Sequence, residues 1–247
     1  MNEAWPQNYR LHHLEETDST NEEARRLAIA GADAPLWILA DRQTKGRGRR
    51  GREWQAPAGN LTATLLLRPD RPLAQCAQLS FVAALAAGEM ITQHAPSVDV
   101  ALKWPNDVLA QGRKIAGILL ESAGNGPARP DWLAVGIGAN LAAHPAEVEF
   151  PATSLAALDV KVPGPKEALA SLAAHWARWY EVWMERGFTP IRDAWLVRAA
   201  GLGTRIRARL ADGETHGMFE GIDEGGALLL RENPARLRVI SAGDVFF

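Results

Sequence analysis

The pattern of apolar residues changes near residue 200, and this change divides the chain into two parts. In the stretch 166–186, apolar side chains recur at helical spacing, at Leu169, Leu172, Trp176, Tyr180 and Trp183. The stretch 203–247 instead holds short alternating segments separated by turns that contain glycine or proline. Such a pattern fits a small β-barrel of about 45 to 50 residues. The sequence therefore predicts two domains, residues 1–199 and residues 200–247.

The first 199 residues mix predicted helices and strands. A helix begins at Ser19 and Thr20, where two capping boxes precede an apolar face, and Gly31 ends it. Further helices are predicted over 73–91, 166–186 and 190–199. Strands are predicted over 36–40, 61–67, 98–103, 108–110, 114–121 and 132–141.

Composition excludes several classes of protein. Hydrophobic residues make up 47% of the chain and charged residues 23%, as in a globular protein. The single cysteine, Cys76, excludes a disulfide framework and is predicted to be a core residue. The N-terminal residues lack the order of a signal peptide, and the longest uncharged stretch, 72–88, is short for a membrane span. We therefore expect a cytoplasmic protein with no membrane partner.

Positive charge is concentrated in one segment, although the net charge of the chain is only −2. This Arg/Gly loop, residues 42–54, holds Arg42, Lys45, Arg47, Arg49, Arg50 and Arg52. Its three glycines let the backbone approach a ligand, and its arginines can bind phosphate or carboxylate oxygens in pairs. Trp54 offers a flat face for an adenine, worth about 1–3 kcal/mol by analogy with base stacking. An anion site is therefore predicted; a nucleic-acid-contacting loop and a solvated basic turn are the alternatives, and the Walker A pattern is absent.

Three further segments carry groups suited to catalysis. Lys103-Trp104-Pro105-Asn106-Asp107 places a cation, an amide and a carboxylate on a proline-fixed turn at a strand end, although a simple solvated turn fits equally well. Lys114 begins the apolar strand 114–121, where most lysines are merely exposed edge residues. The segment 136–140 brings two glycines and Asn140 together, and glycines in a strand often only mark close packing.

Taken together and in this order, these segments resemble the biotin–protein ligases. The resemblance is carried by G-R-G-R-R-G-R-x-W, K-W-P-N-D and K-I-A-G-I-L-x-E, with Asp18-Ser19-Thr20-Asn21 and Gln43 ahead of them. It spans residues 14–247. Lys45 stands where a small residue is usual, and Ala139 where isoleucine is frequent. Neither departure removes a functional group.

The resemblance implies a fold and an activity. The fold is α+β: a mixed β-sheet with flanking helices forms a biotin/lipoyl ligase-like catalytic domain, and the C-terminal barrel is SH3-like. ATP and biotin would react, with Mg²⁺, to biotinyl-5′-AMP and pyrophosphate. The biotinyl group would then pass to one lysine of the biotin carboxyl carrier domain of acetyl-CoA carboxylase or a related carboxylase.

The resemblance also implies roles for single residues. Lys114, Arg49 and Asp107 are the expected catalytic residues, with Asp107 as the base that accepts a proton from the acceptor lysine. Biotin's ureido ring would be surrounded by hydroxyl and amide groups, Trp54 would lie on the adenine, and Asn106 and Asn140 would lie near phosphate or its Mg²⁺. The metal ligands are not assigned. The full expected ligand-binding set is Ser19, Thr20, Asn21, Gln43, Gly46, Arg47, Gly48, Arg49, Arg52, Trp54, Lys103, Asn106, Lys114, Gly117 and Asn140.

The Arg/Gly loop is also expected to act as a lid that is mobile without ligand and orders around the adenylate. Only residues 1–13 precede the first motif, too few for a winged helix-turn-helix, so we expect no binding of DNA. A lipoate or octanoate ligase or transferase on the same fold is the enzymatic alternative, and a nucleic-acid-binding module that uses residues 42–52 is the non-enzymatic one. The sequence leaves open whether the chain forms a homodimer.

Overall fold

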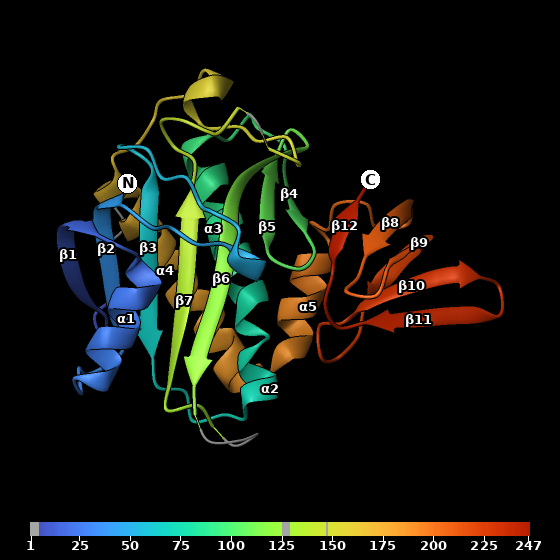
Figure 1. Ribbon diagram of the computed structural model, residues 1–247, viewed down its shortest axis with the longest axis horizontal. Coiled ribbons are helices and arrows are strands. Elements are labelled where there is room, and N and C mark those ends of the chain that lie inside the picture. Colours follow the sequence, from blue (N-terminus) through green and yellow to red (C-terminus); the bar gives the residue numbers. More distant parts are fainter. Residues whose placement is uncertain (1–4, 125–128, 147) are drawn as a thin grey trace.

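A seven-stranded mixed β-sheet forms the larger part of the molecule, as a computed structural model that describes residues 5–124, 129–146 and 148–247 shows (Figure 1). The strand order is β1-β2-β3-β7-β6-β5-β4. β1 and β2 pair in parallel, and the other pairs are antiparallel. The strands are β1 Arg10–Thr17, β2 Leu36–Gln43, β3 Leu61–Leu67, β4 Val100–Lys103, β5 Asp107–Ala110, β6 Arg113–Ala123 and β7 Trp132–Ala139. This architecture confirms the predicted α+β class.

Helices cover both faces of the sheet. The helices are α1 Thr20–Ile29, α2 Leu73–Cys76, α3 Leu79–His94, α4 Pro165–Arg186 and α5 Phe188–Leu196, with short 3-10 turns at Arg49–Gly51 and Ala156–Leu158. α3 and α4 pack on one face, and α1 packs on the other (Figure 1). Side chains alternate accordingly: Val135 and Ile137 join the main core under α3, whereas Trp132 and Ala134 join a smaller core under α1. Cys76 is fully buried in the main core, as predicted.

The apolar segment Leu73–His94 is the one stretch among the described residues that could cross a membrane by length and composition. In the structure 67% of its most apolar window is buried. Its helix α3 packs between the sheet and α4. It is therefore the central core helix of the fold.

Three elements differ from the sequence-based predictions. β1 was not predicted, because histidines and glutamates interrupt its apolar pattern; it is a sheet edge held only by β2. The helix predicted over 73–91 is divided into α2 and α3 by a tight turn, where Phe81 N–H donates to Gln78 O at 3.0 Å. The last predicted helix ends earlier, at Leu196, because the backbone of residues 198–200 pairs with Leu102.

The predicted capping boxes at the start of α1 are wrong. Ser19 occupies the N-cap position, but no side-chain hydrogen bond caps the helix. The Thr20 hydroxyl instead donates to Gln43 Oε1 at 3.0 Å. The predicted end is confirmed, since Gly31 follows the C-cap with a φ of +80°.

A second, five-stranded antiparallel sheet forms the C-terminal region and confirms the predicted change to an all-β structure. Its order is β11-β10-β9-β8-β12, with β8 Arg205–Arg209, β9 Glu214–Ile222, β10 Leu228–Asn233, β11 Arg236–Ile240 and β12 Asp244–Phe246. It packs against the first region, where Trp104 Nε1 donates to Gly226 O at 3.0 Å. The SH3-like closure and the domain boundary at residues 199 and 200 stay predictions.

Candidate active site

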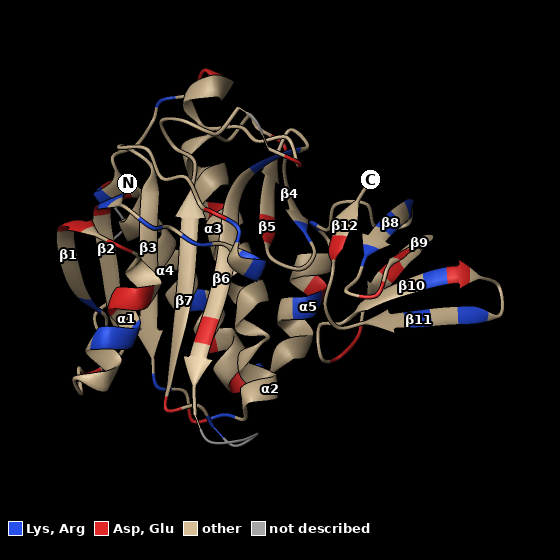
Figure 2. Cartoon of the chain, viewed as in Figure 1, with Lys and Arg blue, Asp and Glu red and all other residues tan. Residues whose placement is uncertain are grey.

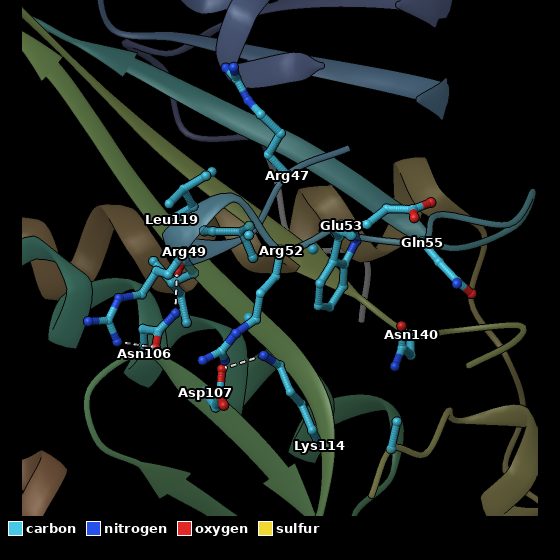
Figure 3. Close-up of a pocket in the computed structure, with 18 of the residues that line it drawn as sticks. Arg47, Arg49, Arg52, Glu53, Gln55, Asn106, Asp107, Lys114, Leu119 and Asn140 are labelled. Atoms are coloured by element: carbon cyan, nitrogen blue, oxygen red, sulfur yellow. Dashed lines mark hydrogen bonds and ion pairs between the residues drawn. The ribbon is translucent and has the colours of Figure 1, made fainter. Parts of the chain in front are cut away.

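A cavity of about 310 Å³ opens on the α1 side of the large sheet. Its walls come from the sheet, the Arg/Gly loop, the segment that follows β7, and β12 of the C-terminal sheet (Figure 3). It brings together the expected catalytic residues and every expected ligand-binding residue except Gly46. Gly46 lies behind the wall, where a Cβ would collide with the carbonyl oxygen of Trp54.

Strand register builds the floor of the cavity as a row across the sheet. Thr62 pairs with Gly138, Gly138 with Gly117, Gly117 with Asp107, and Asp107 with Lys103. Paired residues of neighbouring strands share a face, so these five side-chain positions all point toward the α1 side. The row places a carboxylate and an ammonium group at one end of the floor and small residues at its centre.

The glycines of β7 make room for two large side chains. A Cβ at position 136 would collide with the Asn21 amide, and a Cβ at position 138 would collide with the Trp54 indole. The sequence analysis gave close packing as one reason for glycines in this strand, and the structure confirms it. Trp54 therefore lies flat against the floor, with Lys114 Nζ 5.5 Å from its ring centroid.

Neutral hydrogen-bonding groups line the end of the cavity beside α1. Gln43 Oε1 accepts from the Thr20 backbone N–H at 2.7 Å and from its hydroxyl at 3.0 Å, which fixes the orientation of the Gln43 amide. The Asn21 amide is already engaged by protein groups: its Nδ2 donates to Glu121 and to Leu119 O, and Thr64 donates to its Oδ1 at 2.6 Å. Asn21 thus braces this end more than it presents free groups to it.

A carboxylate between two lysines forms the opposite end. Lys114 Nζ lies 2.6 Å from Asp107 Oδ1, an ion pair without hydrogen-bond geometry (Figure 3). Lys103 Nζ lies 3.4 Å from Asp107 Oδ2. Lys103 is only 5% exposed. Burial lowers the pKa of Lys103, and the charge of Asp107 opposes that shift.

The arginines of the Arg/Gly loop all have partners within the chain. Arg47 pairs with Glu22 at 3.2 Å and Glu121 at 3.7 Å, and Arg49 donates to Asn106 Oδ1 at 3.2 Å. Arg50 and Arg52 pair with Asp244, a buried carboxylate of β12. Burial raises the pKa of Asp244, but the hydrogen bond and charge of Arg52 outweigh it, so the pKa is lowered. Carboxylates of the protein therefore balance the charge of Arg47, Arg50 and Arg52, whereas Arg49 contacts the amide of Asn106.

Several cavity residues were not anticipated from the sequence. Asp244 and Phe246 come from the C-terminal sheet, and Phe150 comes from the segment after β7. Figure 2 shows acidic positions on β5 and β12 beside the basic residues of the loop, β4 and β8. The sequence holds one sign of Asp244: the loop carries an excess of arginine, and carboxylates from elsewhere in the chain can balance that positive charge.

Asn106 and Asn140 differ in what they could offer a Mg²⁺ ion. Among the described residues, three or more His, Cys, Asp or Glu side chains nowhere gather as a metal site. Asn106 is committed, since its Nδ2 donates to Ile118 O at 2.6 Å and its Oδ1 accepts from Arg49. Asn140 Oδ1 is buried without a partner, and Mg²⁺ characteristically takes one or two protein oxygens together with phosphates and water.

The arrangement can hold a molecule with a neutral polar head and an acidic tail. Donors and acceptors surround the end near Thr20 and Gln43, while cations gather at the end near Lys114 and Arg52. Two anions that must react would be brought together at the cationic end, where positive groups offset their repulsion.

Known proteins share both parts of this architecture. The model of the biotin/lipoate A/B protein ligase family matches residues 14–140, and that of the biotin protein ligase C-terminal domain matches residues 201–247. A biotin–[acetyl-CoA-carboxylase] ligase of Paracoccus denitrificans is 51% identical over 95% of this chain and 99% of its own length. The bifunctional ligase/repressor BirA of Bacillus subtilis is 36% identical over 91% of this chain and 70% of its own length.

Solved structures show the same likeness. The biotin protein ligase of Aquifex aeolicus, solved in complex with biotin and ATP, superposes with a TM-score of 0.81 and 30% identity over 96% of this chain and 97% of its own. The family match, the close relatives and the shared fold agree with the resemblance seen in the sequence. The chain belongs to the biotin/lipoate A/B protein ligase family, among its biotin protein ligases.

Proposed function

We propose that this protein activates biotin with ATP to biotinyl-5′-AMP and transfers the biotinyl group to a lysine of a biotin carboxyl carrier domain. One observation carries the proposal: a single cavity joins a neutral hydrogen-bonding end to a cationic end that contains Lys114 and Asp107. Relatives that share both domains are named for the same activity, on acetyl-CoA carboxylase.

At the neutral end, the ureido ring of biotin would meet Ser19, Thr20 and Gln43. Gln43 Oε1 is occupied by Thr20, so its Nε2 is left to donate to the ureido oxygen. Asn21 supports this end through Thr64 and Glu121. The backbone of residues 47–49 would follow the tail of biotin toward Lys114.

In the first step a carboxylate oxygen of biotin attacks the α-phosphorus of ATP, and the bond to pyrophosphate breaks. Lys114, Arg49 and Arg52 offset the charge that the two anions bring together. Magnesium, where present, would be held by Asn140 Oδ1 and would withdraw charge from the phosphates. Trp54 would provide the apolar face for the adenine.

In the second step the amine of the acceptor lysine attacks the carbonyl carbon of the adenylate. An amide bond forms, the bond from that carbon to the phosphate oxygen breaks, and AMP leaves. The amine must shed protons as it reacts, and Asp107 is the carboxylate within the cavity that stands beside Lys114 to accept one.

Other features of the proposal follow from the site. We expect the loop arginines to serve the cavity rather than nucleic acid, because they pair with Glu22, Glu121 and Asp244. A cytoplasmic location is part of the same proposal. The domain boundary at residues 199 and 200 and the SH3-like barrel belong to the same proposal; a homodimer is left to sedimentation or light scattering.

The test compares labelled biotin with labelled lipoate. Pyrophosphate release should require biotin and ATP, should not occur with lipoate, and should be followed by label on a carrier domain when one is added. Equal activation of lipoate would support the alternative ligase. Tight duplex binding with a steep dependence on salt would instead support the nucleic-acid module.

A further inference from the structure

Asp107 contacts two lysines whose surroundings differ. Lys114 lies 2.6 Å from Oδ1 and has a side chain that is 26% exposed on the cavity wall. Lys103 lies 3.4 Å from Oδ2 and has a side chain that is only 6% exposed. One carboxylate therefore holds an accessible ammonium group on one oxygen and an enclosed ammonium group on the other.

The enclosure of Lys103 comes from parts of the chain that are far apart in sequence. The β4–β5 register sets Lys103 opposite Asp107. The ring of Phe150 lies 4.1 Å from Lys103 Nζ, and the ring of Phe246 lies 5.9 Å from it. Aromatic faces attract an ammonium group while they exclude water. The two rings and the carboxylate of Asp107 thus hold the ammonium group of Lys103 in place.

Because their side chains differ in exposure, Lys114 and Lys103 can play different parts in the reaction. Lys114 can turn into the cavity toward an anion, because its side chain lies on the cavity wall and is 26% exposed, with the centroid of the Trp54 ring 5.5 Å from its ammonium group. Lys103 can reach a phosphate only by leaving both rings and Asp107. Once Lys114 engages an anion, Asp107 would be a buried carboxylate without a cation unless Lys103 stays, and an unpaired buried charge is costly.

We infer that Lys103 is a positioning residue for the transfer step, which keeps Asp107 charged and oriented after Lys114 has turned to the adenylate. The inference rests on the proposed function. Departure of Lys114 uncovers Asp107 Oδ1, which then accepts a proton from the attacking lysine nitrogen as the amide bond forms and AMP leaves. Charged groups that face Asp107 include Lys103 of β4, Lys114 of β6 and Arg49 of the loop.

The test is Lys103→Met, which keeps most of the length of the side chain and removes its charge. Pyrophosphate release on adding biotin and ATP measures the first step, and single-turnover transfer from the preformed enzyme–adenylate complex to a carrier domain measures the second. Transfer should fall about tenfold or more beyond any loss in adenylation, a part of the ~10²–10⁴-fold that a positioned base contributes. The KM values for ATP and biotin should change less than about threefold, whereas a ligand-binding lysine would raise them clearly.

Two further variants separate positioning from simple damage to the fold. Lys103→Arg keeps the charge and should recover most of the transfer rate. Phe246→Leu keeps Lys103 and removes one aromatic wall, so it should show the same selective loss to a smaller extent. Lys166→Met, at an exposed position of α4, is the matched control and should behave as wild type.

Several outcomes would overturn the inference. Wild-type transfer by Lys103→Met, equal losses in both steps, or an arginine variant no better than the methionine variant would each do so. Failure of the proposed function looks different: the wild-type enzyme itself would release no pyrophosphate from ATP with biotin.

Discussion

Lys114 is a half-buried cation at the reacting end of the cavity. It lies at the start of β6, where the segment 151–153 runs beside it and Lys114 N–H donates to Pro151 O at 2.8 Å. The backbone of residue 114 is therefore fixed, while its ammonium group pairs with Asp107 at the cavity wall. A change of its side chain can remove charge without disturbing the strand.

Lys114→Ala should lower the rate of adenylate formation by about 10²–10³-fold, because a positive group aimed at the developing charge is lost. Pyrophosphate release measures that rate. Thermal unfolding should stay within a few degrees of wild type. Lys166→Ala, on the exposed side of α4, is the control. Adenylation at the wild-type rate would show that Lys114 does not act on the reacting anions.

Asp107→Asn should slow transfer from preformed adenylate by roughly 10²-fold and slow adenylation much less, since only transfer needs a proton acceptor. Asparagine keeps the size of the side chain and removes its basicity. Single-turnover assays separate the two steps. Losses of similar size in both would point to a structural or phosphate-site role for Asp107.

The sequence was informative about individual residues wherever a motif is local. The segments around Trp54, Asp107 and Lys114 predicted residues of the site, and the structure brings these residues together in one cavity. Asp244 and Phe246 could not be found that way, because they come from a sheet whose pairing partners and position are set by tertiary packing. The hydrogen bond of the Thr20 hydroxyl was missed as well, since a capping pattern in sequence does not reveal that this hydroxyl donates to Gln43 and leaves the helix uncapped.

At the scale of elements, Glu89 ties α3 to α4. It accepts hydrogen bonds from Trp179 Nε1 at 3.0 Å and from Arg178, and it lies 3.1 Å from His175 Nδ1. Burial raises the pKa of Glu89, but these partners outweigh it and lower the pKa to about 2. The pair of helices therefore depends on a charged carboxylate.

Glu89→Gln should destabilise the fold at pH 7 by about 1–2 kcal/mol, a figure reduced for the partial exposure of the site to solvent. A lowered pKa stabilises the folded state above the unfolded value near 4.5, and the benefit is lost as pH falls toward 2. The difference in urea unfolding free energy between wild type and variant should therefore shrink between pH 5 and about 2. A difference independent of pH would contradict this account.

The Arg/Gly loop is the element whose conformation matters most for the intermediate. Within it Gly48 N–H donates to Arg52 O at 2.7 Å and Trp54 N–H donates to Gly46 O at 3.0 Å, so the loop folds back on itself over the cavity. Arg49 is half-buried and donates hydrogen bonds to Asn106 Oδ1 and Gly243 O. Burial lowers the pKa of Arg49. The lid motion stays a prediction, now with Arg49 as a contact that closes it.

Arg49→Gly removes a guanidinium and adds chain freedom. The adenylate should dissociate about tenfold faster, which corresponds to the loss of one charge-assisted contact of about 1.4 kcal/mol. Label should also appear on lysines of a bystander protein, because released adenylate reacts without guidance. A wild-type dissociation rate with no rise in bystander labelling would exclude a lid role for Arg49.

Elements were predictable from sequence where their pattern is long and one-sided. The helix over 166–186 and the strand pattern of β3, β6 and β7 were found within a few residues. β1 was missed because a strand paired on one side needs no strong apolar alternation. The division between α2 and α3 was missed because it depends on packing at Gln78, whose side chain bonds to Trp183 and to Glu224 O.

At the scale of the whole molecule, the two sheets share the cavity. Asp244 of β12 pairs with Arg50 and Arg52 of the loop, and Arg209 of β8 binds Glu149 of the segment after β7 at 2.6 Å. The C-terminal sheet thus holds two covering segments of the catalytic cavity. No sequence pattern could indicate this, because the contact joins residues more than 190 positions apart.

Asp244→Asn should raise the KM for ATP about tenfold, because the loop loses its ionic link to β12 and ligand binding must then order it. The KM for biotin should rise less. Glu220→Gln, which breaks an exposed pair with Arg231 on the same sheet, is the matched control. A lower KM for ATP would instead mean that Asp244 competes with phosphate for the arginines.

The central claim, an acyl-adenylate passed to lysine, is tested most directly by the fate of the carboxylate oxygens of biotin. Biotin labelled with ¹⁸O in its carboxylate is given to the enzyme with ATP and a carrier domain, and AMP is analysed by mass spectrometry. AMP should carry one ¹⁸O atom, because the oxygen that attacks the α-phosphorus leaves with AMP when the amide forms. Unlabelled AMP, or label in pyrophosphate or orthophosphate, would contradict the account.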